Sequence, residues 1–479
     1  MGITRLHMDQ RHRVVSGLSH TGIVAWSLAV AMAAVGCSPQ GGGPGGDGGG
    51  GPGGNGGGGP GGNGGGGPTH PQCTAGVGKP TTCSLARYAL GTVAPNSAHG
   101  AFAVAVADMN CDGYDDVVTA NPNDDDLTPP DNMPTVGVML NRRDGTFAAM
   151  AQYAAASTDS KGAPGFAGAL ALGDLDGNGA PDVVAFGGEL GASPFYMLND
   201  GTGKLGAPVA ISFTPNDSAE NQFTFGSNLA VVDMNGDGNL DVVLQPTGTQ
   251  YVVVFMNQGR ATFGSNVDYD VFPGAPSTPD LGGFAVADFN GDGKPDVAVL
   301  DRDNVNITVL LNTGNGTLGA PTHFTITNAG TPGLALDNRL AAADFDGDGK
   351  VDLAYSDEHT NVGIALNKGG GTFASPTFLT VADTDGGSLI AADLDHDGHQ
   401  DLVLTQAGTG GTMQVLMNAG GGSFGAPVPL AAGSTTTRVD AGNFKGDGLL
   451  GLAVTSFDNI DNPKAPAPTL YTVDATCSP

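Results

Sequence analysis

The chain is poor in basic residues. Only 18 of its 479 residues are Lys or Arg, against 48 Asp and Glu, which gives a formal net charge of −30. Nucleic acids and anionic membrane surfaces both require a cationic face on the protein that binds them. We therefore expect no nucleic-acid partner and no electrostatic attachment to a membrane. Charged residues make up only 14% of the chain and Gly contributes 81 residues, so the composition differs from that of an average globular protein.

The chain also lacks the short motifs of common enzymes. No serine-nucleophile elbow, H-E-x-x-H, phosphate-binding loop or dinucleotide-binding motif occurs in the structural context that it requires. Histidine is scarce, with nine in the chain. Five of these lie in the part that we expect to fold, and none has an obvious catalytic partner: His99, His323, His359, His396 and His399. The sequence predicts that the protein is not an enzyme.

Long hydrophobic runs are missing as well. The longest, Gly22–Gly36 ("GIVAWSLAVAMAAVG"), follows a basic start and is too short to span a bilayer comfortably. We interpret residues 1–36 as a signal peptide. The stretch "AAVGC" resembles a bacterial lipobox, which implies that Cys37 becomes the lipidated N-terminus of an outer-membrane or cell-surface lipoprotein. An ordinary signal peptide, and therefore a secreted protein, is the alternative.

Residues 37–70 have almost no apolar side chains to offset the entropy of folding, and residues 39–68 consist nearly entirely of Gly and Pro. This segment is predicted to be a tether between the lipid and a folded body, residues 71–479. A Gly-rich coil of this length has an r.m.s. reach of roughly 30 Å.

From Cys83 onward the sequence is repetitive. An acidic nine-residue pattern, D-x-[DN]-x-[DN]-G-x-x-D, recurs six times at intervals of 49 to 66 residues, and a degenerate copy follows. The six intact copies begin at Asp108, Asp174, Asp233, Asp288, Asp344 and Asp393, and the degenerate copy at Asn443. Each is preceded by a run of small apolar residues and followed by a β-rich run, an apolar run that ends in Asn, and a Gly-rich turn.

Each repeat therefore predicts four short strands joined by turns, without helical periodicity. Four-stranded repeats of about 50 residues are typical of β-propeller blades. We expect an all-β, seven-bladed β-propeller in which an N-terminal strand, "CSLARYALG", completes the last blade. This closure would place Cys83 beside Cys477, and we predict a disulfide there. Cys73 and Cys111 would then be the second pair, which is one of the three connectivities that four cysteines allow.

The acidic turns are predicted to bind calcium. Side chains at positions 1, 3, 5 and 9 and the backbone carbonyl at position 7 can converge on one ion if Gly at position 6 turns sharply, and oxygen ligands of this number suit Ca²⁺. An EF-hand is excluded because position 12 is not Glu and no helices flank the turn. The six predicted ligand sets are Asp108, Asn110, Asp112, Tyr114 and Asp116; Asp174, Asp176, Asn178, Ala180 and Asp182; Asp233, Asn235, Asp237, Asn239 and Asp241; Asp288, Asn290, Asp292, Lys294 and Asp296; Asp344, Asp346, Asp348, Lys350 and Asp352; and Asp393, Asp395, Asp397, His399 and Asp401.

The degenerate copy is not expected to bind an ion. Asn443, Lys445 and Gly451 replace three of its ligands, and Lys445 brings a positive charge to the place where the cation would lie. About six calcium ions are therefore expected in total.

The turns "DFNGDGKPD" and "DFDGDGKVD", with the later "LLNTGNGTLGAP" and "ALNKGGGTFASP", resemble FG-GAP/VCBS repeats. These repeats form the blades of integrin α-subunit propellers and of many bacterial surface proteins. The resemblance implies a propeller with structural calcium loops, and it is unspecific for function.

We expect a calcium-stabilised binding or adhesion module whose protein or glycan ligand contacts the face opposite the calcium turns, near Asp124–Asp131. The alternatives are a carbohydrate-active enzyme similar to propeller polysaccharide lyases, and a purely architectural surface protein.

Overall fold

The computed structural model describes most of residues 103–456 and, for secondary structure only, residues 82–92 and 469–478. The gaps between residues 103 and 456 are 122–134, 145, 156–167, 187–192, 215–226, 247–248, 275–280, 302–305, 327–338, 358–359, 383–386, 406–411, 432–435 and 447–448. The predicted signal peptide, the tether, Cys37, Cys73 and the ligand-face loop at residues 124–131 lie outside the described residues.

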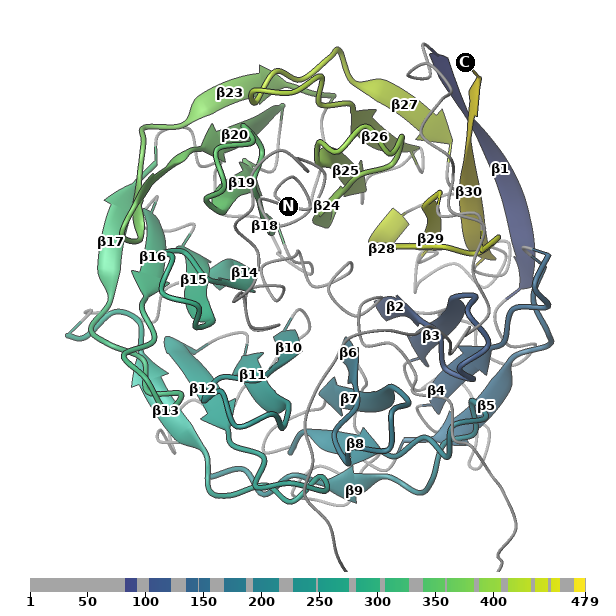
Figure 1. Cartoon of the computed structure of the whole chain (residues 1–479), viewed down its shortest axis with the longest axis horizontal. Coiled ribbons are helices and arrows are strands. Elements are labelled where there is room, and N and C mark those ends of the chain that lie inside the picture. Colours follow the sequence, from purple (N-terminus) through teal and green to yellow (C-terminus); the bar gives the residue numbers. More distant parts are fainter. Residues whose placement is uncertain are drawn as a thin grey trace, which may run out of the picture.

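The described chain forms a ring of four-stranded antiparallel sheets arranged around a central axis (Figure 1). We call a sheet built from four consecutive repeat strands a blade; one blade also carries a small extra hairpin between its third and fourth strands. Blades 1 to 3 consist of β2 (Ala103–Ala107), β3 (Asp116–Asn121), β4 (Thr135–Met139) and β5 (Ala151–Ala154); β6 (Ala169–Gly173), β7 (Asp182–Phe186), β8 (Phe195–Met197) and β9 (Val209–Ala210); and β10 (Asn228–Val232), β11 (Asp241–Gln245), β12 (Tyr251–Phe255) and β13 (Val267–Asp270).

Blades 4 to 6 repeat this arrangement. They consist of β14 (Leu281–Ala287), β15 (Asp296–Asp301), β16 (Asn306–Leu310) and β17 (Thr322–Thr325); β18 (Leu340–Ala343), β19 (Asp352–Ser356), β20 (Asn361–Ala365) and β23 (Thr377–Thr380); and β24 (Leu389–Ala392), β25 (Asp401–Thr405), β26 (Thr412–Leu416) and β27 (Val428–Ala431). The small hairpin in blade 5 is formed by β21 (Asn367–Gly369) and β22 (Thr372–Phe373).

The predicted seven-bladed propeller is corrected to six blades. The remaining four-stranded sheet is a composite of both chain ends, with the order β28 (Thr436–Gly442), β29 (Gly451–Ser456), β30 (Thr469–Ser478) and β1 (Thr82–Thr92). We call it the closing sheet. It differs from the blades because its outer strand comes from the opposite end of the chain and its turn, at Asn443, has lost the acidic pattern.

Residue size explains the order of the strands from the axis to the rim. The innermost strands converge on the axis, where only small side chains fit, and β18 is "LAAA". The second and third strands are almost fully buried between neighbouring blades, whereas the outermost strands, such as β9 and β17, are largely exposed. The core is therefore a series of apolar layers between blades, as in the cluster of Ala285 and Val309 from blade 4 with Leu340 and Leu353 from blade 5.

The two chain ends pair along their length. The β1 and β30 strands are antiparallel, with Cys83 directly opposite Cys477 in the register. The N-terminal segment thus provides the outer strand, as the sequence predicted. Cys111 is disulfide-bonded, and every other cysteine lies outside the residues whose side chains are described.

The register supports the prediction of a Cys83–Cys477 disulfide, because directly opposed residues in an antiparallel pair lie within the Cα separation that a disulfide needs. Peptide mapping without reduction should recover the two cysteines in one cross-linked fragment. The double variant Cys83→Ser with Cys477→Ser should lower the free energy of unfolding by about 2–4 kcal/mol. A Cys83 found bonded to Cys111 would contradict this pairing.

Candidate metal centres

Each acidic turn lies between the first and second strands of its blade, and its side chains are held by the backbone of the same turn. In blade 2, Asp174 Oδ1 accepts the N–H groups of Gly177 and Asn178 at 2.8 and 3.0 Å, and its Oδ2 accepts that of Gly179 at 2.8 Å. Asp176 Oδ1 accepts the N–H of Asn178 at 3.0 Å. These hydrogen bonds bend the side chains inward, so the ligand arrangement is formed by the fold itself.

The glycine at position 6 of each intact turn has the conformation that the sequence predicted. Its φ angle is between 83° and 90° in all six copies, in a region that residues with a Cβ rarely adopt. The six residues are Gly113, Gly179, Gly238, Gly293, Gly349 and Gly398.

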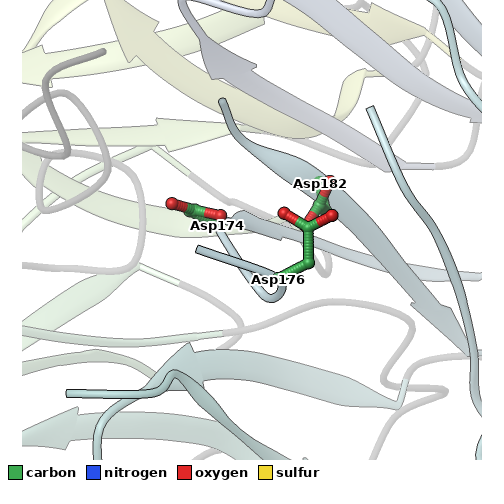
Figure 2. Close-up of side chains that lie close together, drawn as sticks. All are labelled: Asp174, Asp176 and Asp182. Carbon is green, nitrogen blue, oxygen red and sulfur yellow. The ribbon is translucent and has the colours of Figure 1, made fainter. Parts of the chain in front are cut away.

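Three of the turns gather carboxylates closely enough to hold a metal ion. In each of them, ligand oxygens of three aspartates lie within 4.8 Å of one another. The groups are Asp174, Asp176 and Asp182 (Figure 2); Asp344, Asp346 and Asp348; and Asp393, Asp395 and Asp401. The other three turns carry Asn at position 3, as Asn290 does in blade 4, so an amide oxygen replaces one of the carboxylates there.

Three of the position 5 carboxylates, those of Asp237, Asp292 and Asp348, are exposed to solvent. Lys294 and Lys350, whose backbone carbonyls are the predicted ligands at position 7, form exposed ion pairs with Asp292 and Asp348. Exposed pairs of this kind contribute little stability. A metal ion could therefore replace the lysine ammonium group beside each of these two carboxylates.

The aspartate at position 9 is buried in every intact turn. In blade 4, Asp296 Oδ2 accepts the N–H of Phe289 at 2.9 Å and Oδ1 accepts the N–H of Asn312 at 2.7 Å. Burial raises the pKa of Asp296 from 3.8 to about 7, against the opposing effect of these two hydrogen bonds. The equivalent aspartates show the same rise, to a pKa of about 6 for Asp241 and about 8 for Asp401.

A second set of residues, which the sequence identifies only as the Asn at the end of each apolar run, connects each turn to the preceding blade. Asn312 Nδ2 donates to Pro295 O in its own turn at 3.1 Å and to Met234 O in the acidic turn of blade 3 at 2.7 Å. Its Oδ1 accepts the N–H of Gly314 at 3.0 Å. We call this arrangement the Asn latch.

The Asn latch recurs in all six blades. The other five latch residues are Asn141, Asn199, Asn257, Asn367 and Asn418. The recurring Asn was the signal that could have identified the latch, but its acceptor lies in another repeat.

The latch of blade 1 also closes the ring. Asn141 Nδ2 donates to Phe444 O, in the degenerate turn, at 2.6 Å. Two buried carboxylates add to this contact between blade 1 and the closing sheet. Asp440 Oδ2 accepts the N–H of Val106 at 2.9 Å, and Asp115 Oδ2 accepts that of Asn443 at 2.7 Å. The degenerate turn has therefore kept its backbone role in the ring while losing its ligand residues.

Comparison with known proteins agrees with this architecture. A model of the FG-GAP-like repeat matches six overlapping segments: residues 108–185, 174–244, 233–299, 288–355, 344–404 and 393–454. A search of curated proteins found no match.

Several solved structures are similar to this chain at low sequence identity. A lectin of Agrocybe aegerita that recognises non-reducing terminal N-acetylglucosamine is 21% identical, with 78% of this chain and 85% of the lectin covered and a TM-score of 0.50. Virginiamycin B lyase from Staphylococcus aureus is 12% identical, with 82% and 99% covered and a TM-score of 0.48. NanB sialidase from Streptococcus pneumoniae is 11% identical, with 79% and 68% covered and a TM-score of 0.44.

Replacement of one latch residue should destabilise the ring. Asn312→Ala leaves the carbonyls of Met234 and Pro295 without their buried donor, which we expect to cost about 2–4 kcal/mol of unfolding free energy. Urea denaturation measures the change. Asn315→Gly is the matched control, because Asn315 is an exposed residue of the same turn with φ of 52°. Equal stability of the two variants would contradict the latch.

The raised pKa of the position 9 carboxyls predicts a pH dependence for metal-free protein. A folded-state pKa above the unfolded value stabilises the fold fully below about pH 4, and this contribution is lost as the pH rises through about 7. Protein freed of divalent ions on a chelating resin should therefore lose unfolding free energy between about pH 5 and 8. Urea denaturation across this range, at constant ionic strength, tests the sign. Greater stability of the metal-free protein at pH 8 than at pH 5 would contradict this prediction.

Proposed function

The chain belongs to the FG-GAP-like repeat family, and from this premise we propose that it is a calcium-stabilised, non-catalytic binding module displayed at the cell surface. The observation that carries the proposal is the convergence of three aspartate side chains in equivalent turns of three different blades. One such turn would be a local feature. A repeated arrangement with backbone-held carboxylates supports a common cation.

The donor set favours calcium over other metals. The turns offer carboxylate, amide and carbonyl oxygens, which are the ligands that hard cations prefer. Zinc would favour Cys or His side chains, and among the turns only His396 and His399 of blade 6 are of that kind, since Cys111 of blade 1 is disulfide-bonded. Six occupied turns would change the formal charge from −30 to −18, since six ions add twelve positive charges.

Calcium in a turn would act on more than one blade. A cation beside the position 9 aspartate favours its ionised form, and the ionised carboxylate is the stronger acceptor for the N–H of the latch residue. In blade 4 the latch residue, Asn312, also holds the turn of blade 3. Each ion would therefore stabilise the contact with the preceding blade as well as its own turn.

The described histidines lie at packing and turn positions. His323 Nδ1 lies 2.8 Å from Thr308 Oγ1, and its ring stacks on Phe272 with a centroid separation of 4.8 Å, at the outer edge of blade 4. The other two described histidines belong to the acidic turn of blade 6. His323 thus packs against Thr308 and Phe272, and the other two histidines lie among the predicted ligand residues of their turn.

We propose a glycan as the ligand, bound on the face opposite the acidic turns. The likeness to the Agrocybe aegerita lectin supports a glycan over a protein ligand. The loops of that face, including residues 122–134 and 457–468, lie outside the described residues. In this proposal the lipid on Cys37 and the Gly-rich tether present the ring at a distance from the outer membrane. Within the described part of the chain there is no helix with the length and apolar character needed to cross a bilayer.

Removal of calcium should lower the melting temperature, because an ion that binds only the folded state stabilises it by mass action. Elemental analysis should return about six calcium ions per chain. An unchanged melting curve in excess EGTA, or purified protein without alkaline-earth metal, would contradict the proposal.

Asp176→Ala should remove one bound calcium ion and part of the calcium-dependent shift in melting temperature. Asp200→Ala, an exposed aspartate in the later turn of the same blade, should remove neither.

A glycan array probed with calcium-loaded and metal-free protein tests the function itself. Binding that requires calcium, with N-acetylglucosamine-terminated glycans among the candidates, is the expected result. Binding to extracellular-matrix proteins alone would replace the glycan by a protein ligand. Release of products from acidic polysaccharides would favour the carbohydrate-active enzyme, and no binding at all would favour a purely architectural protein.

A further inference from the structure

The acidic turn of blade 6 differs from the other five intact turns in its histidines. It reads "DLDHDGHQD", with His396 at position 4 and His399 at position 7. Four of the other turns have Gly at position 4, and the fifth has Cys111, which is disulfide-bonded. Their position 7 residues are Tyr, Ala, Asn and Lys. Among the described acidic turns, that of blade 6 alone adds imidazole groups to its carboxylates.

The turn of blade 5 is the natural comparison for that of blade 6. Both turns have Asp at positions 1, 3, 5 and 9, and in both of them three carboxylates offer oxygens within 4.8 Å of one another. At positions 4 and 7, blade 5 has Gly347 and Lys350 instead of histidine. Positions 2 and 8 also differ, but their side chains are buried in both turns. A difference in metal preference between the two turns would therefore come from positions 4 and 7.

The half-buried His399 lies between the acidic turn and the later Gly-rich turn of its blade. Its backbone N–H donates to Asp397 Oδ1 at 2.9 Å. A Cβ added at Gly420 would come within 2.6 Å of His399 Nε2, so the glycine leaves room for the imidazole ring. In blades 4 and 5 the position 7 side chains, Lys294 and Lys350, reach the position 5 carboxylate of their own turn. Position 7 is therefore a place from which a side chain contacts the ligand carboxylates.

Both histidines lie within electrostatic range of Asp395. Burial raises the pKa of Asp395, with Asp397 acting in the same direction, whereas His399 and His396 both lower it. His396 acts in the same way on Asp393, whose pKa burial also raises. Asp395 is thus a carboxylate near two imidazoles. Two histidines with one carboxylate are a ligand set that proteins use for transition metals, zinc among them.

We propose that the turn of blade 6 binds Zn²⁺ in preference to Ca²⁺, with His396, His399 and Asp395 as the side chains that select it. Zinc accepts imidazole nitrogen and is satisfied by about four ligands, whereas calcium takes about six to eight oxygens. Asp395 is also the predicted position 3 ligand for calcium, so the two ions compete for this turn. The inference rests on the proposed function in one respect, which is that calcium occupies the turn when zinc is absent.

Calorimetric titration of Zn²⁺ into calcium-saturated full-length protein, without a polyhistidine tag, tests the site. One zinc ion per chain should bind with a dissociation constant of about 10 μM or tighter. Elemental analysis after gel filtration should then find one zinc ion gained and one calcium ion lost. His396→Gly with His399→Lys copies positions 4 and 7 of blade 5 and should weaken zinc binding by at least about tenfold, with the calcium content unchanged. His323→Gln, a histidine outside the turns, is the matched control and should leave zinc affinity unchanged.

The reverse exchange gives a second test that does not depend on the stability of an altered blade 6. Gly347→His with Lys350→His places the same two histidines in the turn of blade 5 and should create a second zinc site.

Three results overturn the proposal: no zinc binding, zinc binding that survives the exchange in blade 6 undiminished, or zinc bound to calcium-loaded protein without loss of a calcium ion. The two proposals fail separately. Protein that binds calcium and no zinc refutes only the zinc site, whereas protein that binds one zinc ion at His396 and His399 and no calcium refutes only the proposed calcium stabilisation.

Discussion

The ring depends on one buried carboxylate in each acidic turn. The position 9 aspartate opens the second strand of its blade and accepts one backbone N–H from its own turn and one from the latch residue at the end of the third strand. It therefore ties three parts of a blade together at a place where water is excluded. Burial makes its charge unfavourable, so the strength of this connection depends on what else neutralises the carboxylate.

The Asn latch links each position 9 carboxylate to the neighbouring blade. Each latch side chain donates to two carbonyls, one in its own turn and one in the turn of the preceding blade, so neighbouring turns cannot rearrange independently. Between blades, the apolar layers consist mainly of Ala, Val, Leu, Ile and Phe side chains, whose contacts have no fixed direction. The latches add directional contacts, and these specify how far each blade is rotated relative to the one before it.

Features within one repeat could be predicted from the sequence, because spacing and residue type determine them locally. The four strands, the glycine at position 6 and the clustering of aspartates in the turns are of this kind. The latch could not be predicted in the same way. Asn312 is 78 residues from Met234, and no local pattern indicates that the two meet.

The number of blades was misjudged. The sequence predicted that an N-terminal strand completes the sheet of the degenerate turn at Asn443, and that composite sheet was counted as a seventh blade. The ligand face lies in loops outside the described residues, so that part of the prediction stays untested.

The pairing of β1 with β30 has a mechanical consequence. Tension applied to the chain before Thr82 acts along β1, parallel to a ladder of ten residue pairs that ends at Thr92 and Thr469. When the predicted Cys83–Cys477 disulfide is reduced, the backbone hydrogen bonds of that ladder are loaded together in shear, rather than opened one after another. The ring should therefore resist pulling from its N-terminal side far better than the short outer strands of the other sheets would allow.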